Sequence, residues 1–233
     1  MEVLNILPKR LYKFSYDGKS EPLMLLLDSL KKDLVSQLNI EHKTDGILHG
    51  NELGLPSGLM DMDVGHFKRN HEEIYDFMMD SLTQVINHEQ FIDKEFFMSQ
   101  IWGTVYHTSG QAHGKHIHPN SVFSSIFNVD AMPPNNTTNF HSSIGGLFGE
   151  GELQNIYTHK EAKEASDLAD DIEISHKPGD YLVFRSNLAH SVPHFDIQRL
   201  GETRIVMSAN YWMRKMGSKM RATYLNIDDI EKE

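Results

Sequence analysis

The chain has 233 residues, a formal net charge of −11 and no cysteine. This length predicts one domain with a well-buried core. An acidic chain lacks the clustered Lys and Arg that bind a nucleic-acid backbone, so we expect no nucleic-acid partner. Without cysteine there are no disulfides or thiolate ligands, and a metal site must use histidine and carboxylate. No apolar run approaches the ~20 residues that span a bilayer, and we see no signal peptide. We therefore expect a cytoplasmic protein without membrane association.

A first amphipathic helix is predicted over residues 20–38, with Ser20 as N-cap and Pro22 in the first turn. Its apolar positions recur at helical spacing, which favours burial of one face. They are Leu23, Leu26, Leu27, Leu30, Leu34 and Leu38. Residues 1–14 alternate roughly and are expected to form an edge strand.

A second helix is predicted over residues 70–87. Asn70 and Glu73 have the spacing of a capping box at its start. Its apolar face consists of Ile74, Met78, Leu82 and either Val85 or Ile86. Residues 42–65 are rich in Gly, Asp and Asn, and we expect them to form a loop.

From residue 96 onward the apolar period changes to two, which predicts strands. The predicted strands cover residues 96–107, 121–130, 180–184 and 203–212. Residues 133–170 are expected to form a long insertion or a set of loops. Two helices followed by many short strands predict a mainly β, α+β protein with an antiparallel sandwich or barrel. We expect a single domain over 1–233, with helical support at about 20–90 and the barrel core at about 96–213.

The stretch HGKHIHPNS contains three histidines in six positions. Residues two apart in a strand point to the same face, so His116 and His118 are expected to project to one side. His113 would face the other side of a regular strand, and we place it at the rim of the site. A third ligand must come from a distant segment, and His190, just past the end of a short apolar strand, is the best candidate.

Arg204 opens the last predicted strand, and Ser208 and Asn210 fall on the same face of it. A cation with a nearby hydroxyl, facing the same interior as the histidines, suits a dicarboxylate that chelates the metal at one end. Arg199, in the loop DIQRLGE, is the rival for this role. Placement on a strand favours Arg204.

The stretch from about Ile101 to Trp212 resembles the Fe(II)- and 2-oxoglutarate-dependent oxygenases. More narrowly, it is similar to oxygenases of bacteria and marine phages that carry an H-x-H-P-x-S motif. The matching segments are HIHPNSVFSSIFNV, KPGDYLVFRSNLAHSV and TRIVMSANYW. They occur in the expected order and cover roughly half of the chain.

This resemblance implies a double-stranded β-helix, a jelly-roll or cupin-like barrel, that binds Fe(II) and the cosubstrate 2-oxoglutarate. The metal ligands that it implies are His116, His118 and His190. It also implies that Arg204 binds the far carboxylate of 2-oxoglutarate and that Tyr106 lies near the cosubstrate. Asn128 and Ser208 are weaker candidates for the same pocket.

The sequence departs from the usual triad of two histidines and one carboxylate. His118 occupies the carboxylate position, so three neutral imidazoles leave the iron charge less compensated. Anionic 2-oxoglutarate or another anion would supply the difference. A literal H-x-D occurs at His194 and Asp196, but no histidine follows it to act as distal ligand, and we reject it. A site with two histidines and water, in which His118 does not ligate the metal, stays open.

A cupin is the alternative interpretation. Gly110 precedes His116-x-His118 at the spacing of the first cupin motif, and Gly179 precedes His190 as in part of the second. The glutamate of the first motif is missing. The alternative function is therefore a metal-binding barrel without 2-oxoglutarate-dependent activity.

The sequence predicts a dioxygenase, most simply a hydroxylase, that couples oxidative decarboxylation of 2-oxoglutarate to oxidation of a small-molecule or peptidyl substrate by dioxygen. Residues 42–65 and 133–170 are expected to act as lids. The identity of the substrate and the formation of a homodimer are left open.

Overall fold

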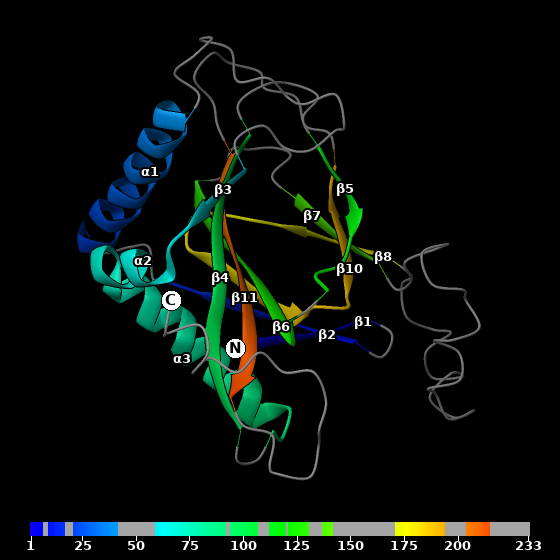
Figure 1. Cartoon of the computed structure of the whole chain (residues 1–233). Helices are drawn as coiled ribbons and strands as arrows, with labels where there is room; N and C mark the ends of the chain where they lie inside the picture. Colours follow the sequence, from blue (N-terminus) through cyan, green and yellow to red (C-terminus); the bar gives the residue numbers. More distant parts are fainter. Residues whose placement is uncertain are drawn as a thin grey trace, which may run out of the picture.

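The computed structural model describes residues 1–6, 9–16, 21–41, 59–91, 94–106, 112–119, 121–130, 137–141, 171–193 and 204–214. Two antiparallel sheets face each other, and the helices cover the outer face of the larger sheet (Figure 1). Among these residues, no helix combines the length and the apolar character needed to cross a bilayer.

The larger sheet has seven strands in the order β1-β2-β9-β6-β11-β4-β3. In that order they are Glu2–Ile6, Lys9–Ser15, Asp180–Arg185, Phe123–Asp130, Arg204–Arg214, Glu95–Tyr106 and Leu59–Met62. The four strands predicted from the period-two pattern all form, and they lie next to one another in the centre of this sheet.

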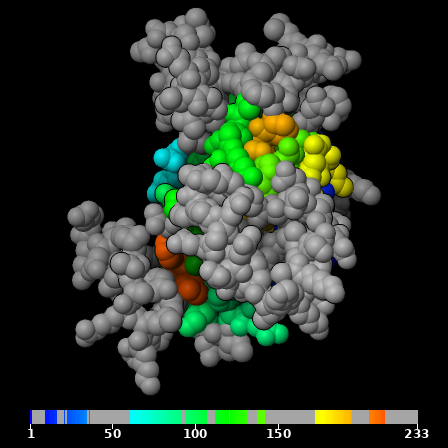
Figure 2. Space-filling model, turned by 90° about the vertical axis from the view of Figure 1, so that its right-hand side faces the viewer, coloured from blue at the N-terminus to red at the C-terminus, as the bar shows by residue number. Residues whose placement is uncertain are grey.

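The smaller sheet has four strands in the order β5-β10-β7-β8. They are His113–His116, Ala189–Val192, Thr137–His141 and Asp171–Ser175. Figure 2 shows them side by side at the surface, from β5 in green through β10 in orange to β8 in yellow. From β4 onward the chain passes repeatedly between the two sheets, which is the winding of a jelly roll. The predicted double-stranded β-helix is confirmed.

The larger sheet is buried on both faces, because it lies between the helices and the smaller sheet. In β6 every residue from Phe123 to Val129 is buried. Phe127 packs in the cluster beneath the helices, whereas Ile126 packs between the two sheets. Strands covered on both sides lose the simple alternation of apolar and polar residues.

Helix α1 (Glu21–Glu41) packs its predicted apolar face against the larger sheet. Its buried leucines are Leu23, Leu27, Leu30 and Leu34. Leu26 is partly buried at the edge of the same cluster. The predicted N-cap Ser20 and the side chain of Leu38 lie outside the described residues.

The second predicted helix is two helices, α2 (Val64–Asn70) and α3 (Glu72–His88). The predicted capping box was wrong, because Asn70 is the last residue of α2. The N-cap of α2 is Asp63, whose carboxylate accepts a hydrogen bond from the backbone N–H of His66 at 2.6 Å. The long apolar stripe therefore belongs to α3, which begins at Glu72, two residues after the predicted start.

The predicted loops also contain strands. Residues 59–62, placed in the loop 42–65, form β3 and pair with β4. Residues 137–141, placed in the insertion 133–170, form β7 at the centre of the smaller sheet. Strands this short carry too few alternating residues to stand out from their polar surroundings.

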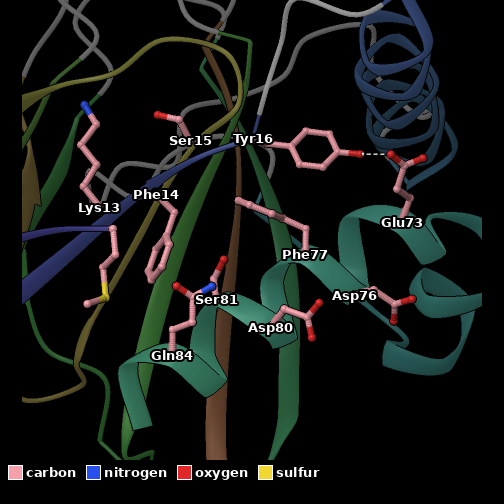
Figure 3. Close-up of a pocket in the computed structure, with 11 residues that line it drawn as sticks. Lys13, Phe14, Ser15, Tyr16, Glu73, Asp76, Phe77, Asp80, Ser81 and Gln84 are labelled. Atoms are coloured by element: carbon pink, nitrogen blue, oxygen red, sulfur yellow. Dashed lines mark hydrogen bonds between the residues drawn. The ribbon is translucent and has the colours of Figure 1, made fainter. Parts of the chain in front are cut away.

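A shallow hollow lies between β2 and α3 on the helix-covered side of the larger sheet (Figure 3). Tyr16 of β2's C-terminal end points toward α3, where its hydroxyl donates a 2.6 Å hydrogen bond to Glu73. Phe14 and Phe77 form part of its apolar floor. This hollow shares no lining residue with the cavity described next.

Candidate metal centre

Three histidine side chains meet in a cavity lined by both sheets. The potential ligand atoms of His116, His118 and His190 all lie within 4.8 Å of one another, and the described residues contain no other such group. The Nε2 atoms of His118 and His190 are 3.2 Å apart. Two nitrogens bound to one ion at about 2.1 Å and at a right angle would be about 3.0 Å apart. The spacing therefore fits two neighbouring ligands of a single metal ion.

His190 lies on β10 and pairs directly with His116 of β5. Its Nδ1 is 3.1 Å from the backbone carbonyl of Leu188. Because a carbonyl only accepts, Nδ1 carries the proton and Nε2 is left with its lone pair. The rings of Phe140 and Phe184 pack against the imidazole and hold its plane. The residue is thus presented as a pre-oriented Nε2 ligand.

His116 is oriented in the same way. Its Nδ1 donates to the carbonyl of Gly114 at 2.8 Å, which again leaves Nε2 as the available ligand atom. The rings of His116 and His190 lie 4.2 Å apart between centroids. Two of the three histidines therefore have the tautomer that a metal site requires.

His118 lies beyond the end of β5, so the expectation that one strand carries both His116 and His118 was wrong. The backbone N–H of His118 donates to the carbonyl of Ser186 at 2.9 Å. Ser121 donates to the Ser186 hydroxyl at 2.7 Å, so both His118 and Ser121 are fastened to the turn before β10. The His118 ring nevertheless lies 5.1 Å from that of His116. A loop contact, rather than strand alternation, brings the two together.

His113 stacks on His116, with ring centroids 4.0 Å apart and planes at 15°. His113 would face the opposite side of a regular strand, but the pairing of β5 is irregular at this point. His190 and Val192 of β10 pair with His116 and His113 of β5, so two residues lie between the paired positions on β5 and one on β10. Such a bulge shifts the alternation by one position. His113 consequently lines the cavity.

Burial keeps the clustered imidazoles neutral. It lowers the pKa of His118 to about 3 and that of His113 to about 4, with further lowering from neighbouring histidines. Burial also places the pKa of His190 well below its usual value. Neutral imidazole is the form that ligates metals, so the cluster is ready for a cation at neutral pH.

Arg204 is buried in the same cavity, with only 1% of its surface exposed. It opens β11 opposite Tyr106 of β4, whose ring centroid lies 5.1 Å from the guanidinium carbon. Its Nη2 donates to the hydroxyl of Thr138 at 3.1 Å. Nε and Nη1 have no hydrogen-bond partner within the described structure. Burial lowers the pKa of Arg204, but a guanidinium stays protonated in proteins, so the cavity holds a cation with two open donor positions.

Thr138 and His176 extend the polar contacts of Arg204, although neither lines the cavity and neither was predicted from the sequence. The Thr138 hydroxyl lies 2.8 Å from Nε2 of His176 and accepts from Arg204. Thr138 belongs to β7, which was predicted as loop, and His176 follows β8. No local pattern marks either residue, because their contact joins strands that are distant in sequence.

The weaker candidates differ in position. Ser208 is half-buried and lines the cavity. Asn128 is fully buried on the face of β6 that carries Ile126, but it is not among the residues that line the cavity. Trp102, which was not predicted, lines it with its ring 5.4 Å from that of His118.

Several alternatives considered from the sequence lie outside the described residues. They are the H-x-D at His194 and Asp196, the rival Arg199, and Gly110 of the partial cupin motif.

Residues 100–210 match the model of a protein family described as "Putative 2OG-Fe(II) oxygenase". This segment contains the histidine cluster and Arg204. The family match, the jelly roll and the histidine cluster together indicate a 2OG-Fe(II) oxygenase, an oxidoreductase that uses Fe(II), 2-oxoglutarate and dioxygen. The class predicted from the sequence is confirmed, and a cupin without this activity is not favoured.

Solved structures share the fold. A prolyl-4-hydroxylase from Pseudomonas putida gives a TM-score of 0.51 at 14% identity, over 89% of this chain and 93% of that chain. SnoN, a non-heme alpha-ketoglutarate-dependent epimerase from nogalamycin biosynthesis, gives 0.56 at 9% identity, over 86% of this chain and 75% of that chain. SnoN has also been solved with Fe3+ and alpha-ketoglutarate. No curated protein matches the sequence. At these identities the likeness establishes the fold, and a fold hosts many substrates.

Proposed function

We propose that the chain is a dioxygenase in which the Nε2 atoms of His116, His118 and His190 hold Fe(II). The 3.2 Å separation between His118 and His190 supports this ligand set. The carbonyl contacts of the other two Nδ1 atoms support it as well, because they fix the ligating tautomer before the metal arrives.

We propose that Arg204 binds the far carboxylate of 2-oxoglutarate, with the Thr138 hydroxyl beside it. The observation that carries this proposal is the buried guanidinium with two unpartnered N–H groups in the cavity of the histidine cluster. Burying a charge without a partner is costly. A dicarboxylate that reaches both the metal and Arg204 would satisfy the cation and the open donors at once. The guanidinium carbon of Arg204 lies over the Tyr106 ring, 5.1 Å from its centroid.

When bound, Fe(II) supplies the redox chemistry that couples oxidative decarboxylation of 2-oxoglutarate to oxidation of the substrate. The chain contributes placement and exclusion of water. Ile126, Val192 and Val206 line the cavity together with the histidines and Arg204. An apolar wall of this kind strengthens the contacts of Arg204 and of the histidines by lowering the local dielectric.

The finer expectations belong to the same proposal. Hydroxylation of a small-molecule or peptidyl substrate, a homodimer, a cytoplasmic location and relatives in phages stay predictions. So do a single domain over 1–233, lids at 42–65 and 133–170, and roles for Ser208 and Asn128 beside the cosubstrate.

The test is formation of succinate from 2-oxoglutarate. We expect succinate to require added Fe(II) and to be lost in His190→Ala, while His141→Ala, which removes a histidine outside the cluster, keeps it. Fe(II) and 2-oxoglutarate should each raise the melting temperature of the wild type. If neither binds, the oxygenase proposal is wrong.

The cupin-like alternative makes a different prediction for the same experiment. A metal-binding barrel without 2-oxoglutarate chemistry would bind the metal, ignore 2-oxoglutarate and be unaffected by Arg204→Ala. This alternative would be favoured if metal raised the melting temperatures of the wild type and of Arg204→Ala equally and 2-oxoglutarate changed neither.

A further inference from the structure

The proposed ligand set contains no carboxylate. A ligating histidine is a neutral imidazole, so His116, His118 and His190 leave both positive charges of Fe(II) uncompensated. The described residues bring no Asp or Glu into the histidine cluster. Those that line the cavity include no acidic side chain either.

The charges of the complete site can then be compared. Fe(II) contributes two positive charges and the buried Arg204 one, against the two negative charges of 2-oxoglutarate. One positive charge remains. In a site with a carboxylate in place of His118, the same account would close at zero. A residual charge beside buried side chains, where the dielectric is lower than in water, attracts an anion.

The positive charge that remains at this site contrasts with the formal net charge of the whole chain, which is −11. The cavity nevertheless contains the buried guanidinium of Arg204, and Lys115 is exposed on β5 between His113 and His116. Clefts lined by one sign of charge concentrate the opposite ion. The distribution therefore favours an anionic visitor at this site in an otherwise acidic protein.

The half-buried side of the cavity also offers hydrogen-bond donors. Trp102 and Ser208 pair across β4 and β11, and both line the cavity. The Trp102 ring lies 5.4 Å from that of His118. An indole N–H and a hydroxyl are suitable partners for a carboxylate that enters beside the imidazole.

We infer that the substrate carries a negatively charged group, a carboxylate, which lies beside the metal on the side of His118, Trp102 and Ser208. This inference rests on the proposed function. A neutral peptide residue would leave the residual charge uncompensated, so the inference favours small carboxylic acids over neutral peptides. The substitution of His118 for a carboxylate is then matched by the charge of the substrate.

The test uses the wild-type protein with Fe(II) and 2-oxoglutarate under argon in chloride-free buffer. Matched pairs of a carboxylate and its primary amide, aliphatic and aromatic, are titrated while the visible absorption of the iron complex and the melting temperature are followed. We expect the carboxylate of at least one pair to perturb the complex at a concentration roughly tenfold lower than its amide, a difference of about 1.4 kcal/mol.

His118→Asp is the matched variant, because it restores the missing negative charge at the same position. In that variant the preference for the carboxylate over the amide should fall toward equality. The wild-type comparison stands by itself if the variant does not retain iron. A preference that persists undiminished in an iron-loaded His118→Asp protein would overturn the inference.

Other outcomes are also decisive. Equal binding of acid and amide, or no binding of any pair, shows that the site does not select an anion. Chloride is titrated separately into the same complex. If chloride saturates the complex and carboxylates then have no further effect, an inorganic ion supplies the charge, which also overturns the inference. Absence of any iron and 2-oxoglutarate complex at the outset would instead count against the proposed function.

Discussion

The Nε2 atoms of His118 and His190 lie 3.2 Å apart although 72 residues separate them in the chain. Both belong to segments that Ser186 connects, since its carbonyl accepts the His118 N–H in the turn just before β10. The histidine cluster is therefore held together by one turn, which contacts the His118 segment and leads into the strand of His190.

His118 should be a ligand whose role a carboxylate can assume. We expect His118→Ala to lower Fe(II) affinity by at least about tenfold, because it removes one of three ligands, and His118→Asp to retain binding. Anaerobic calorimetry measures both. His141→Ala, outside the cluster, should bind as the wild type does. Unchanged affinity in His118→Ala would show that two histidines suffice.

Arg204→Met should weaken the binding of 2-oxoglutarate without lowering the stability of the protein. Loss of the guanidinium should weaken 2-oxoglutarate binding by about 2–5 kcal/mol, because the buried carboxylate loses its partner. Stability should be unchanged or higher, since a buried cation without a carboxylate is replaced by an apolar chain. Binding titrations and urea unfolding measure the two effects.

Arg185→Met is the matched control for this pair of measurements. Arg185 forms a 2.9 Å ion pair with Glu89 away from the cavity. Its replacement should lower stability by up to about 1 kcal/mol and leave 2-oxoglutarate binding unchanged. Weaker 2-oxoglutarate binding in Arg185→Met, with unchanged binding and lower stability in Arg204→Met, would contradict the assigned roles.

Thr138 should position Arg204 through its hydroxyl. Arg204 Nη2 donates to it at 3.1 Å, and His176 lies 2.8 Å from the same oxygen. We expect Thr138→Val, which keeps the shape, to raise the KM for 2-oxoglutarate several-fold with little change in kcat, because about 1 kcal/mol of a net hydrogen bond is lost. Thr138→Ser should restore the KM. If Thr138→Val keeps the wild-type KM and Thr138→Ser raises it, Thr138 acts by packing alone.

His176 should make the protein sensitive to acid. Burial, followed by Arg204 and Lys13, lowers its pKa to about 3, whereas the unfolded chain titrates near 6.5. Between these values the unfolded chain binds more protons. The contribution of His176 is therefore fully present above about pH 6.5 and is lost as the pH falls below it.

A titration-silent variant isolates this effect. Between pH 7 and pH 4.5 the wild type should lose about 2 kcal/mol more unfolding free energy than His176→Gln, which cannot titrate. Urea unfolding at the two pH values provides the numbers. Parallel losses in both proteins would assign the acid sensitivity to other groups.

Gly179 should tolerate no side chain. Its φ is +86°, and a Cβ would lie 2.8 Å from the carbonyl oxygen of Tyr16. Gly179→Ala should therefore cost about 1–3 kcal/mol of unfolding free energy. Gly114→Ala, where a Cβ meets nothing within 4 Å, should change stability by less than about 0.5 kcal/mol. Equal effects would contradict the strained turn.

Much of the fold could be predicted because it follows from the pattern of apolar residues within short segments of the sequence. The period-two segments became β4, β6, β9 and β11, and the leucine stripe of 20–38 became the buried face of α1. One chemistry was predicted from the motif HIHPNS together with His190 and Arg204. The structure brings His116, His118, His190 and Arg204 into one cavity. Residue type and spacing indicated a metal site with a nearby cation, and the resemblance to the 2-oxoglutarate-dependent oxygenases implied its chemistry.

Other features depend on which strands become neighbours. The bulge between β5 and β10 turns His113 inward, and β7 carries Thr138 to Arg204 across 66 residues of sequence. His118 reaches the site through a loop contact rather than a strand. None of these contacts is local, and each follows from the closure of the two sheets on each other. The sequence by itself determined the class of protein, through its resemblance to a family, and the candidate residues His116, His118, His190 and Arg204. Only the pairing of strands distant in sequence decided how these side chains meet in one cavity and how Thr138 contacts Arg204.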